Sequence, residues 1–560
     1  MARSLSFNRP GLLTIELGIN TLTVGSFAYK QLRLSWEESF TRYLTSGESN
    51  GLDWIDDNKK YIDWLYLKYQ SNPKVKDPVQ KTWRQFKEKM LTVKFSQSTE
   101  QQLKKSYKGG HTYKNNEQYQ ESVLKQYLFG FSVDANSLYP TVERETEYTN
   151  VNGNRVVHYY PYGQGKEFKR DYLNVEEYVN GSLPVGFAKI RILSFSIKRF
   201  ENGKHHTPML RKSGQVGVDP KEYLITNKVN NRVFEVEGWY TIADIEAFKQ
   251  HYDMTYVVER CILFKGSKHL FREFIDKWYE VKQNNIGAKR QLGKLILNSS
   301  YGKLGQSHLN KIENPILDNG ILKIEVEKET DEYGESHDVE YFDSLGAHNM
   351  AMASYITSYA RLKKLEVENF ILEHGGHVVY GDTDSLYIIC EDVAEINYLT
   401  HLLETVNLLD TNASGEIGLW KGEKIFNHYN FVATKKYIVN AVDYYSCDLK
   451  VMDDEMLINT LNENGKYSKI CAGLNAKDMI KYPYTFNLCE NPKEIHSLFV
   501  NGKLYTNVEE NSEGIKDPHI YYDKDLTNPV IGAFITNKKR NVVGGILIEP
   551  TIYIITPKNK

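Results

Sequence analysis

A short run of apolar residues, 378–380, is separated from a second run, 386–389, by a polar turn that carries Asp382 and Asp384. Two apolar runs around such a turn predict a β-hairpin with both acids at its tip. Asp and Gly are ordinary turn residues, so the hairpin alone fits an acid-rich turn without chemistry about equally well. Carboxylates held together repel one another, and a divalent cation with oxygen ligands, normally Mg²⁺, is the usual way to keep them ionised.

A third apolar run, 127–133, predicts a strand that ends at Asp134 and is followed by a sharp turn toward Tyr139. In phosphoryl-transfer enzymes, acids from different strands converge to hold two metal ions about 3.5 to 4 Å apart. Asp134 and Asp384, assisted by Asp382, therefore form a candidate two-metal site. The ring of Tyr139 is placed to lie flat beneath a sugar, although a core tyrosine before a proline explains this segment as well.

Between these acids, residues 271–305 have the periodicity of a helix whose core is 287–302. At about 100° per residue, one side of the helix carries Arg290, Lys294, Asn298 and Tyr301, and the opposite side carries Leu292, Leu295, Ile296 and Ser299. Lys282 lies further round, but its flexible side chain reaches the same anion. Residues 265–311 contain ten Lys or Arg and three Asp or Glu, in a chain of net charge −2. The excess favours a triphosphate site, with a base or sugar on the tyrosine, over a solvated face.

Residues 74–108 form a second basic segment, with ten Lys or Arg, three acids and several aromatic residues. Cationic side chains with aromatic platforms suit single-stranded nucleic acid. An amphipathic helix that buries Trp83, Phe86 and Met90 explains the aromatic residues better. Nucleic-acid binding explains the end of the segment, 104–110, better.

The composition limits the alternatives. A chain of 560 residues exceeds what one hydrophobic core usually serves, so several subdomains are expected. Five cysteines without a C-x-x-C pair disfavour a zinc site or a disulfide framework and favour a reducing compartment. No apolar run approaches the roughly 20 residues of a membrane helix, and no signal core follows Met1, so no membrane partner is expected.

Three elements, in this order, resemble the motifs of family B DNA polymerases: D-x-x-S-L-Y-P at 134–140, K-x-x-x-N-S-x-Y-G at 294–302 and Y-x-D-T-D-S at 380–385. Further elements are similar to the protein-primed subclass, which copies linear genomes capped by a terminal protein: Y-x-G-G at 107–110, T-x-x-A-R at 357–361, K-x-Y at 435–437 and the segment leading into the thumb at 469–473. The resemblance covers the chain from about residue 22 onward. It implies an α+β fold, a right hand of palm, fingers and thumb with family-specific insertions.

The resemblance divides the chain as follows: a post-exonuclease remnant and basic linker at 1–110, the first part of the palm at 111–145, a first terminal-protein region at 146–270, fingers at 271–305, a second terminal-protein region at 306–345, the second part of the palm at 346–474 and a thumb at 475–560. In the second terminal-protein region, an Asn-Gly turn between apolar stretches predicts a hairpin over 316–326. In the family this hairpin wraps the template and drives processivity and strand displacement. A surface hairpin without function is the alternative.

The resemblance also implies roles for single residues. Catalysis falls to Asp134, Asp382 and Asp384, with Asp134 and Asp384 as ligands of two Mg²⁺ ions that Mn²⁺ can replace. Nucleotide binding falls to Tyr139, Lys282, Arg290, Lys294, Asn298 and Tyr301. DNA binding falls to Tyr107, Gly109, Gly110, Ser137, Ser299, Gly302, Thr357, Arg361, Lys435 and Tyr437.

The implied reaction is the addition of deoxynucleotides (dNTPs) to a primer 3′-hydroxyl on a DNA template. Initiation would instead use a hydroxyl of a terminal protein, in the replication of a linear viral or plasmid genome in the cytoplasm of a host cell.

The front of the chain departs from the family. Full-length relatives begin with a 3′–5′ exonuclease that uses an early D-x-E and a later Y-x-x-x-D, and neither pattern occurs in residues 1–106. Residues 22–30 resemble the junction just after that domain. The exonuclease is therefore expected to be lost, to be a separate partner chain, or to lie on a part of the protein that this sequence does not contain. The expectation is a chain that polymerises without proofreading.

Three other interpretations remain. A reverse transcriptase or RNA-dependent polymerase shares the palm, but its last motif sets two adjacent aspartates, whereas Thr383 separates them here. A decayed polymerase could serve as a scaffold that binds DNA or the terminal protein, although the intact Asp134, Lys294 and Asp384 disfavour it. The third interpretation is the polymerase half of a split polymerase–exonuclease pair.

Overall fold

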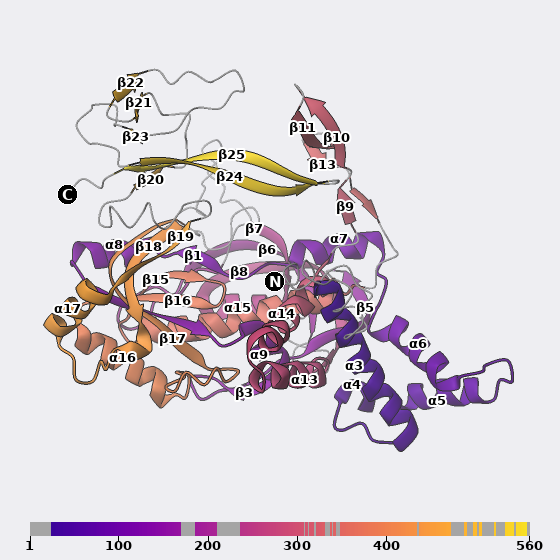
Figure 1. Ribbon diagram of the computed structural model, residues 1–560. Helices are drawn as coiled ribbons and strands as arrows, with labels where there is room; N and C mark the ends of the chain where they lie inside the picture. Colours follow the sequence, from indigo (N-terminus) through magenta and orange to yellow (C-terminus); the bar gives the residue numbers. More distant parts are fainter. Residues whose placement is uncertain are drawn as a thin grey trace.

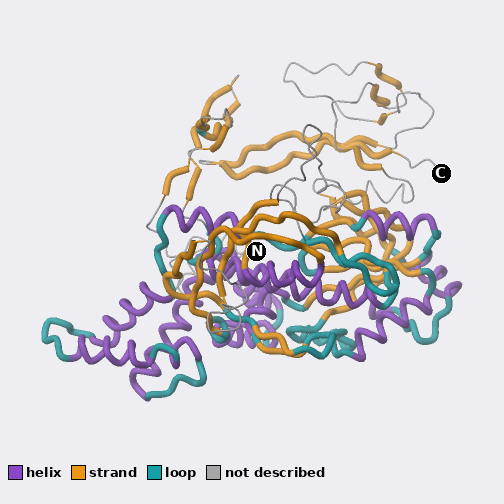
Figure 2. The backbone as a smooth tube through the Cα atoms, turned by 180° about the vertical axis from the view of Figure 1, so that it is seen from behind, coloured by secondary structure: helices purple, strands orange, loops and turns teal. Residues whose placement is uncertain are grey.

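The computed structural model describes residues 24–169, 185–209, 236–306, 309–311, 313–318, 321–330, 336–338, 340–342, 348–433, 436–471, 487–489, 497–500, 503–506, 520–521, 532–542 and 545–556. Its body is a central antiparallel sheet flanked by helices, with a smaller sheet beside it and a helical hairpin that projects to one side (Figure 1). Seen from behind, the same hairpin again leaves the body as a separate arm (Figure 2). The mixture of helices with antiparallel strands confirms the α+β prediction, and none of the helices described could cross a bilayer.

The central sheet has seven strands in the order β1-β15-β16-β2-β17-β18-β19. Their bounds are β1 (Thr112–Lys114), β15 (His377–Asp382), β16 (Ser385–Cys390), β2 (Phe129–Ala135), β17 (Trp420–Ala433), β18 (Lys436–Asp443) and β19 (Lys466–Cys471). All six neighbouring pairs are antiparallel. The helices α15 (Met350–Glu373), α8 (Asn116–Leu124) and α16 (Val393–Thr405) pack against these strands. Because helices cover the strands, β2 and β15 are buried almost throughout, as in sheets sandwiched between helices.

The hairpin predicted at 378–389 is present as β15 and β16, with Thr383 and Asp384 between them. The strand predicted at 127–133 lies two residues later, so Asp134 is inside β2 and does not follow it. The reason is local: the backbone N–H of Tyr127 donates to the carbonyl of Ser122 and so ends α8, and Leu128 is half exposed.

Helices form the N-terminal part of the described chain: α3 (Val24–Ser46), α4 (Asp53–Asp56), α5 (Lys59–Gln70), α6 (Pro78–Met90) and α7 (Gln97–Ser106). Trp83, Phe86 and Met90 on α6 are buried, and the Phe40 ring of α3 lies 5.2 and 5.0 Å from the Trp83 and Phe86 rings. This confirms the amphipathic-helix interpretation of the aromatic residues in this segment.

The smaller sheet has the strand order β5-β8-β6-β7, formed by β5 (Tyr160–Lys169), β8 (Tyr252–Ser267), β6 (Val185–Ile197) and β7 (Val236–Thr241). The helix α12 (Ile242–His251) packs on it, and a short hairpin of β3 (Glu147–Thr149) and β4 (Arg155–Val157) precedes it. This sheet occupies the predicted first terminal-protein region.

The predicted fingers helix is two helices, α13 (Arg272–Gln283) and α14 (Gly287–Leu304), which pack against each other and against α3. The prediction of one continuous helix over 271–305 was therefore wrong, because residues 284–286 separate the two helices. Gly287, the first residue of α14, has a φ of +59°, outside the right-handed helical region, so the chain changes direction where α14 begins. A further short helix, α9 (Leu138–Arg144), follows β2 and contacts both α13 and α14.

The remaining described elements are β9 (Leu309–Lys311), β10 (Glu313–Asp318), β11 (Ile321–Val326), β12 (Lys328–Thr330), β13 (Ser336–Asp338), β14 (Glu340–Phe342), η2 (Tyr444–Ser446), α17 (Asp454–Asn464), β20 (Asn487–Cys489), β21 (Ser497–Val500), β22 (Lys503–Thr506), β23 (Ile520–Tyr521), β24 (Gly532–Val542) and β25 (Gly545–Thr556). Asp318 pairs with Ile321, which confirms the hairpin predicted over 316–326.

Candidate active site

Adjacent strands bring Asp134 and Asp384 together. In the antiparallel register of β16 and β2, Ser385 is the partner of Asp134, and the backbone N–H of Ala135 donates to the Asp384 carbonyl at 2.8 Å. The carboxylate of Asp134 on β2 and that of Asp384 in the β15–β16 turn thus lie at one end of the sheet, as the sequence predicted.

The turn that carries Asp384 is held from the side by β1. Thr383 has a φ of +58°, and its backbone N–H donates to the His111 carbonyl at 3.0 Å. The Thr112 hydroxyl donates to Asp382 Oδ1 at 3.0 Å. Asp382 is 6% exposed and faces β1, so the structure gives it a place beside the turn, supporting the position of Asp384.

Gly110 allows this close approach. A Cβ atom at Gly110 would lie 2.6 Å from the Thr383 side chain, which is far inside van der Waals contact. Of the two predicted DNA-binding glycines, Gly110 therefore lies directly against the acidic turn and is required there by space, whereas a Cβ atom at Gly109 would meet nothing within 4 Å.

The electrostatics of Asp134 show how closely the carboxylates are set. Burial, then the charges of Asp384 and Glu423, raises the pKa of Asp134 to about 7, while Lys294 and Lys421 act in the opposite direction. A divalent cation beside the two carboxylates would relieve this repulsion, so the donor set fits such an ion. Among the described residues no group of three or more His, Cys, Asp or Glu could hold a metal.

A cationic face lies opposite these acids. Arg290, Lys294 and Asn298 are exposed along α14, as predicted. The Lys282 ammonium donates to the Ser137 hydroxyl at 2.9 Å, and burial, with the charges of Arg290 and Lys294, lowers the pKa of Lys282 to about 8. Cations that repel one another at a half-open site are arranged for an anion.

The buried side of α14 differs from the prediction. Ile296 is buried, but Leu292, Leu295 and Ser299 are only half-buried, and Leu297 and Ser300 are buried in their place. The buried face is turned by about 100°, one residue step, from the expected one. The cause is the packing of α14 against both α13 and α3, which periodicity within one helix does not reveal.

Three tyrosines gather at the junction of α7, α9 and α14. The rings of Tyr139 and Tyr301 stack with their centroids 4.0 Å apart and their planes at 22°. Tyr107 joins them, since burial and then Tyr301 raise its pKa, and a Cβ atom at Gly305 would lie 2.7 Å from its hydroxyl. Tyr139 is half-buried and packs against the hydrophobic core.

Several predicted DNA-binding residues have partners inside the protein. Arg361 donates to the carbonyls of Lys108 and Gly109 at 2.7 and 3.0 Å and forms a buried ion pair with Asp244, its Nη2 atom 2.9 and 2.8 Å from the two carboxylate oxygens. Thr357 is buried on the same helix.

The other predicted contacts are spread around the site. The Tyr437 hydroxyl is 2.5 Å from that of Tyr387 within the core. Ser299 is half-buried and Gly302 is exposed, whereas Lys435 lies outside the described residues. DNA contact by these residues stays a prediction.

The comparisons with known proteins agree with this arrangement. The family described as DNA polymerase type B, organellar and viral, matches residues 22–374, more than half of the chain. The chain belongs to this family of type B DNA polymerases.

Relatives of this chain occur in phages. It is 28% identical over 414 residues to a DNA polymerase of Bacillus phage Nf, and 26% identical over 410 residues to that of Bacillus phage phi29. These alignments cover 72% of this chain but 61% and 59% of the phage proteins, so the chain spans about three fifths of the length of the relatives it matches. The fold is similar to that of phi29 DNA polymerase in a complex with primer-template DNA and incoming nucleotide, with a TM-score of 0.54 at 19% identity over 97% of this chain and 69% of the other.

Sequence reasoning missed four charged residues of the candidate site. Lys421 is the β17 partner of Asp134, Glu423 acts on the same carboxylate, Lys364 is buried and donates to the His111 carbonyl at 2.7 Å, and Asp244 pairs with Arg361. None of them lies in a motif. The Lys363-Lys364 pair inside an apolar helix was the one available signal, because lysine is seldom fully buried without a partner.

Proposed function

We propose that this chain is a template-directed DNA polymerase that adds deoxynucleotides to a primer 3′-hydroxyl. The observation that carries the proposal is the position of Asp134 and Asp384 at one end of the sheet, with Lys294 of α14 close enough to lower the pKa of Asp134. A template and primer of DNA are proposed as partners because the phi29 polymerase has been solved with primer-template DNA.

The acids serve the bond-forming end of the reaction. Asp134 and Asp384 would hold the Mg²⁺ ions, which supply activation of the attacking hydroxyl and stabilisation of the leaving oxygen. Asp382, through Thr112 and the turn, fixes the direction of Asp384. Lys421 offsets part of the negative charge around Asp134.

The cations serve the triphosphate. Lys294 and Arg290 are exposed and positioned to neutralise the phosphates, and Lys282 adds a charge fixed by Ser137. Ser137 adopts a left-handed backbone conformation, with a φ of +63°, which turns the chain directly after β2. The stacked Tyr139 then forms the floor of the nucleotide site, where its ring excludes a 2′-hydroxyl.

The test is to replace either acid. Asp134→Asn or Asp384→Asn removes a metal ligand without removing a phosphate contact, so incorporation should fall by at least about 1000-fold, several kcal/mol, while DNA affinity stays unchanged. Primer extension and gel-shift affinity are measured in parallel. Asp253→Asn, on an exposed acid of β8, is the matched control. Residual extension within about tenfold of wild type would contradict the metal assignment.

Initiation on a protein is a finer part of the proposal. We propose that a terminal protein hydroxyl replaces the primer hydroxyl at the ends of a linear viral or plasmid genome, within the host cytoplasm. The support is the Y-x-G-G, T-x-x-A-R and K-x-Y elements and the inserted segments between the palm parts. Transfer of a labelled nucleotide to a protein encoded by the same replicon, abolished by Asp134→Asn, is the expected result.

A further inference from the structure

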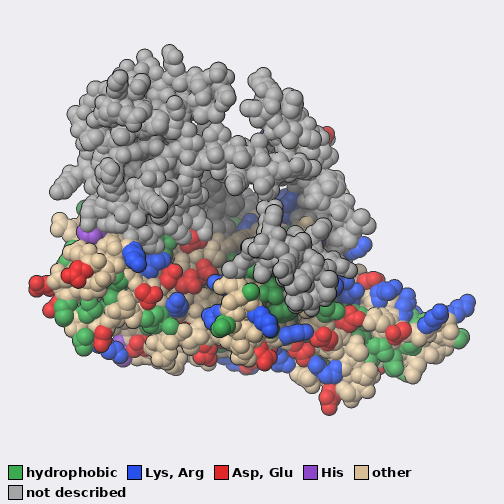
Figure 3. All heavy atoms as spheres, viewed as in Figure 1, with side chains coloured by type: hydrophobic (Ala, Val, Ile, Leu, Met, Phe, Trp, Pro, Cys, Tyr) green, Lys and Arg blue, Asp and Glu red, His purple; other side chains and the backbone are tan. Residues whose placement is uncertain are grey.

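The projecting α5–α6 hairpin is strongly basic. Residues 59–91 contain nine Lys or Arg and three Asp or Glu, although the whole chain has a net charge of −2. Figure 3 shows Lys and Arg side chains over this arm, at the lower right of the view. The arm reaches away from the acids of the central sheet, so its charge needs another partner.

Aromatic rings are exposed among these cations. Trp64 on α5 is 55% exposed and stacks on Tyr61, with the ring centroids 6.1 Å apart and the planes at 20°. The Lys68 ammonium lies 5.1 Å from the Trp64 ring, and the Lys89 ammonium lies 4.6 Å from the Tyr61 ring. An exposed Trp that stacks on a second ring offers a flat apolar face to a ligand.

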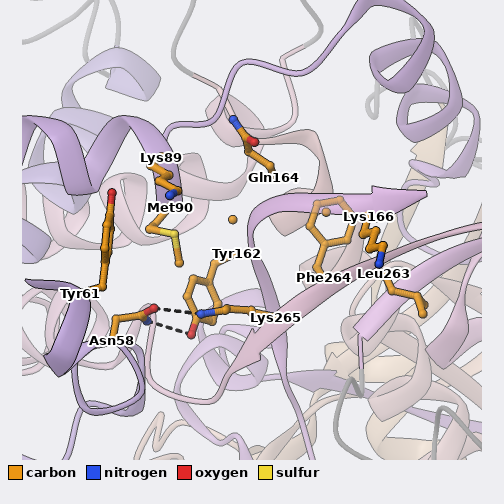
Figure 4. A pocket seen from close by; sticks show the side chains of 12 residues that line it. Asn58, Tyr61, Lys89, Met90, Tyr162, Gln164, Lys166, Leu263, Phe264 and Lys265 are labelled. Atoms are coloured by element: carbon orange, nitrogen blue, oxygen red, sulfur yellow. Dashed lines mark hydrogen bonds between the residues drawn. The ribbon is translucent and has the colours of Figure 1, made fainter. Parts of the chain in front are cut away.

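A cavity of about 430 Å³ opens at the base of the hairpin, between α5, α6 and the strands β5 and β8 (Figure 4). Its apolar lining includes Tyr61, Tyr162 and Phe264, and its charged lining residues are Lys89, Lys166 and Lys265. The Lys265 ammonium donates to Asn58 Oδ1 at 3.0 Å, and Asn58 Nδ2 donates to the Tyr162 hydroxyl at 3.1 Å. These hydrogen bonds position Asn58, Tyr162 and Lys265 in the lining before any ligand arrives.

A bulge in β5 forms the mouth of this cavity. The register with β8 shifts between Tyr162 and Lys166, and Gly163 and Gly165 have φ angles of +83° and +66°. A Cβ atom at Gly165 would lie 2.7 Å from the Phe264 ring. Glycine here keeps both the left-handed backbone and the aromatic floor.

This chemistry fits one class of ligand. Aromatic faces flanked by lysines bind unpaired bases and their phosphates, and stacking contributes at each base without regard to its identity. A duplex hides the faces of its bases, so it would leave Trp64 and the cavity unused. A free nucleotide would occupy the cavity but would not need the row of charge and rings along α5.

We propose that the hairpin and the cavity at its base bind single-stranded DNA, with one base in the cavity and the neighbouring bases and phosphates along α5. This site lies outside the catalytic residues and does not depend on the proposed polymerase activity. Two strands have this chemistry where DNA is copied: the unpaired template ahead of the primer, and a strand displaced from the template.

The first measurement is fluorescence anisotropy of a labelled oligonucleotide of about 16 nucleotides. Trp64→Ala should weaken binding at least about fivefold, because stacking on an aromatic side chain is worth about 1 to 3 kcal/mol per base. Tyr398→Ala is the matched control, since Tyr398 is also a half-exposed aromatic residue on a helix, α16. Equal affinities for the two variants would overturn the proposal.

The second measurement is the salt dependence of the same affinity. Loss of one phosphate contact in Lys166→Gln should reduce the slope of log affinity against log salt by about 0.7. Lys450→Gln, at another exposed lysine, should leave the slope unchanged. A slope that is the same in wild type and Lys166→Gln would show that the cavity does not take part in binding single-stranded DNA.

Substrates with different tails identify the strand. One primer-template carries a long 5′ template extension and a second carries a 5′ flap on the displaced strand. The loss of affinity in Trp64→Ala should appear with one of these tails and be absent from a duplex without them. An equal loss on the bare duplex would overturn the proposal.

The two proposals fail separately. Trp64→Ala and Lys166→Gln should keep normal incorporation on a primer-template with a short overhang. Asp134→Asn should lose incorporation and keep the anisotropy signal. If incorporation survives in Asp134→Asn, the assignment of Asp134 as a metal ligand fails, whereas the hairpin is judged on anisotropy alone.

Discussion

The acidic end of the central sheet and the α5–α6 hairpin both bring charge next to tyrosines, but they hold it differently. At the sheet, like charges are partly buried against one another, which raises the pKa of Asp134 to about 7 and lowers that of Lys282 to about 8. On the hairpin, lysines such as Lys68 lie over rings at the surface. Buried like charges cost folding free energy until a ligand compensates them, whereas exposed lysines cost little. The buried charges at the sheet suit a reaction at one fixed position, and the exposed charges on the hairpin suit a nucleic-acid strand that moves along the surface.

The largest effect on stability is expected at the buried ion pair of Arg361 and Asp244. Asp244→Ala leaves the Arg361 guanidinium buried without its carboxylate, so the free energy of unfolding should fall by about 3 to 5 kcal/mol. Chemical denaturation measures this. Asp253→Ala, at an acid on β8 that is largely exposed, should cost less than about 1 kcal/mol. Similar losses in both variants would show that the Arg361 pair does not hold the site.

Sugar selection should change next. Tyr139→Val removes the ring that stacks on Tyr301, so the ratio of kcat/KM for deoxynucleotides over ribonucleotides should fall by about 10- to 200-fold. Steady-state incorporation of both substrates gives the ratio. Tyr398→Val is the control, and an unchanged ratio in Tyr139→Val would make Tyr139 a core residue only.

A smaller effect is expected in the pH dependence of kcat/KM for the nucleotide, and it should arise from the candidate active site and not from the hairpin. As pH rises through about 8, Lys282 loses its proton in the free enzyme, because burial has lowered its pKa to that value. The positive charge offered to the triphosphate is then lost, so kcat/KM for the nucleotide should fall by up to about tenfold per pH unit above 8. In Lys282→Arg the charge persists, and the fall should move to higher pH. The same fall in both proteins would assign it to another group.

The smallest effect should come from the hairpin. Lys68→Ala removes a surface cation from the rings of Trp64 and Tyr69, and the free energy of unfolding should change by at most about 1 kcal/mol. Thermal unfolding of the variant beside wild type measures it. A loss of several kcal/mol would mean that these lysines hold the fold, and the contrast with the sheet would disappear.

Much of the candidate active site was predictable, because each of its motifs is a short run of neighbouring residues. The hairpin at 378–389 follows from two apolar runs and a polar turn, and the cationic side of α14 follows from helical spacing. Lys421, Lys364 and Asp244 were not predictable, since each meets the site through tertiary register or packing. The same limit explains the turned buried face of α14. On the hairpin, spacing identified the buried rings of α6, but only the structure shows that Trp64 faces solvent.

The segment 108–111 contributes its main chain to the site. The carbonyls of Lys108 and Gly109 accept from Arg361, and the His111 carbonyl accepts from Lys364 and from the backbone of Thr383. Substitution of a side chain leaves a carbonyl in place. In a mutational scan, substitutions at position 109 should therefore be tolerated, because an added Cβ atom meets nothing within 4 Å. Substitutions at position 110 should not be tolerated, because the Cβ atom would lie 2.6 Å from Thr383. Adjacent glycines would then differ in tolerance because one is needed for its backbone and the other for its missing side chain.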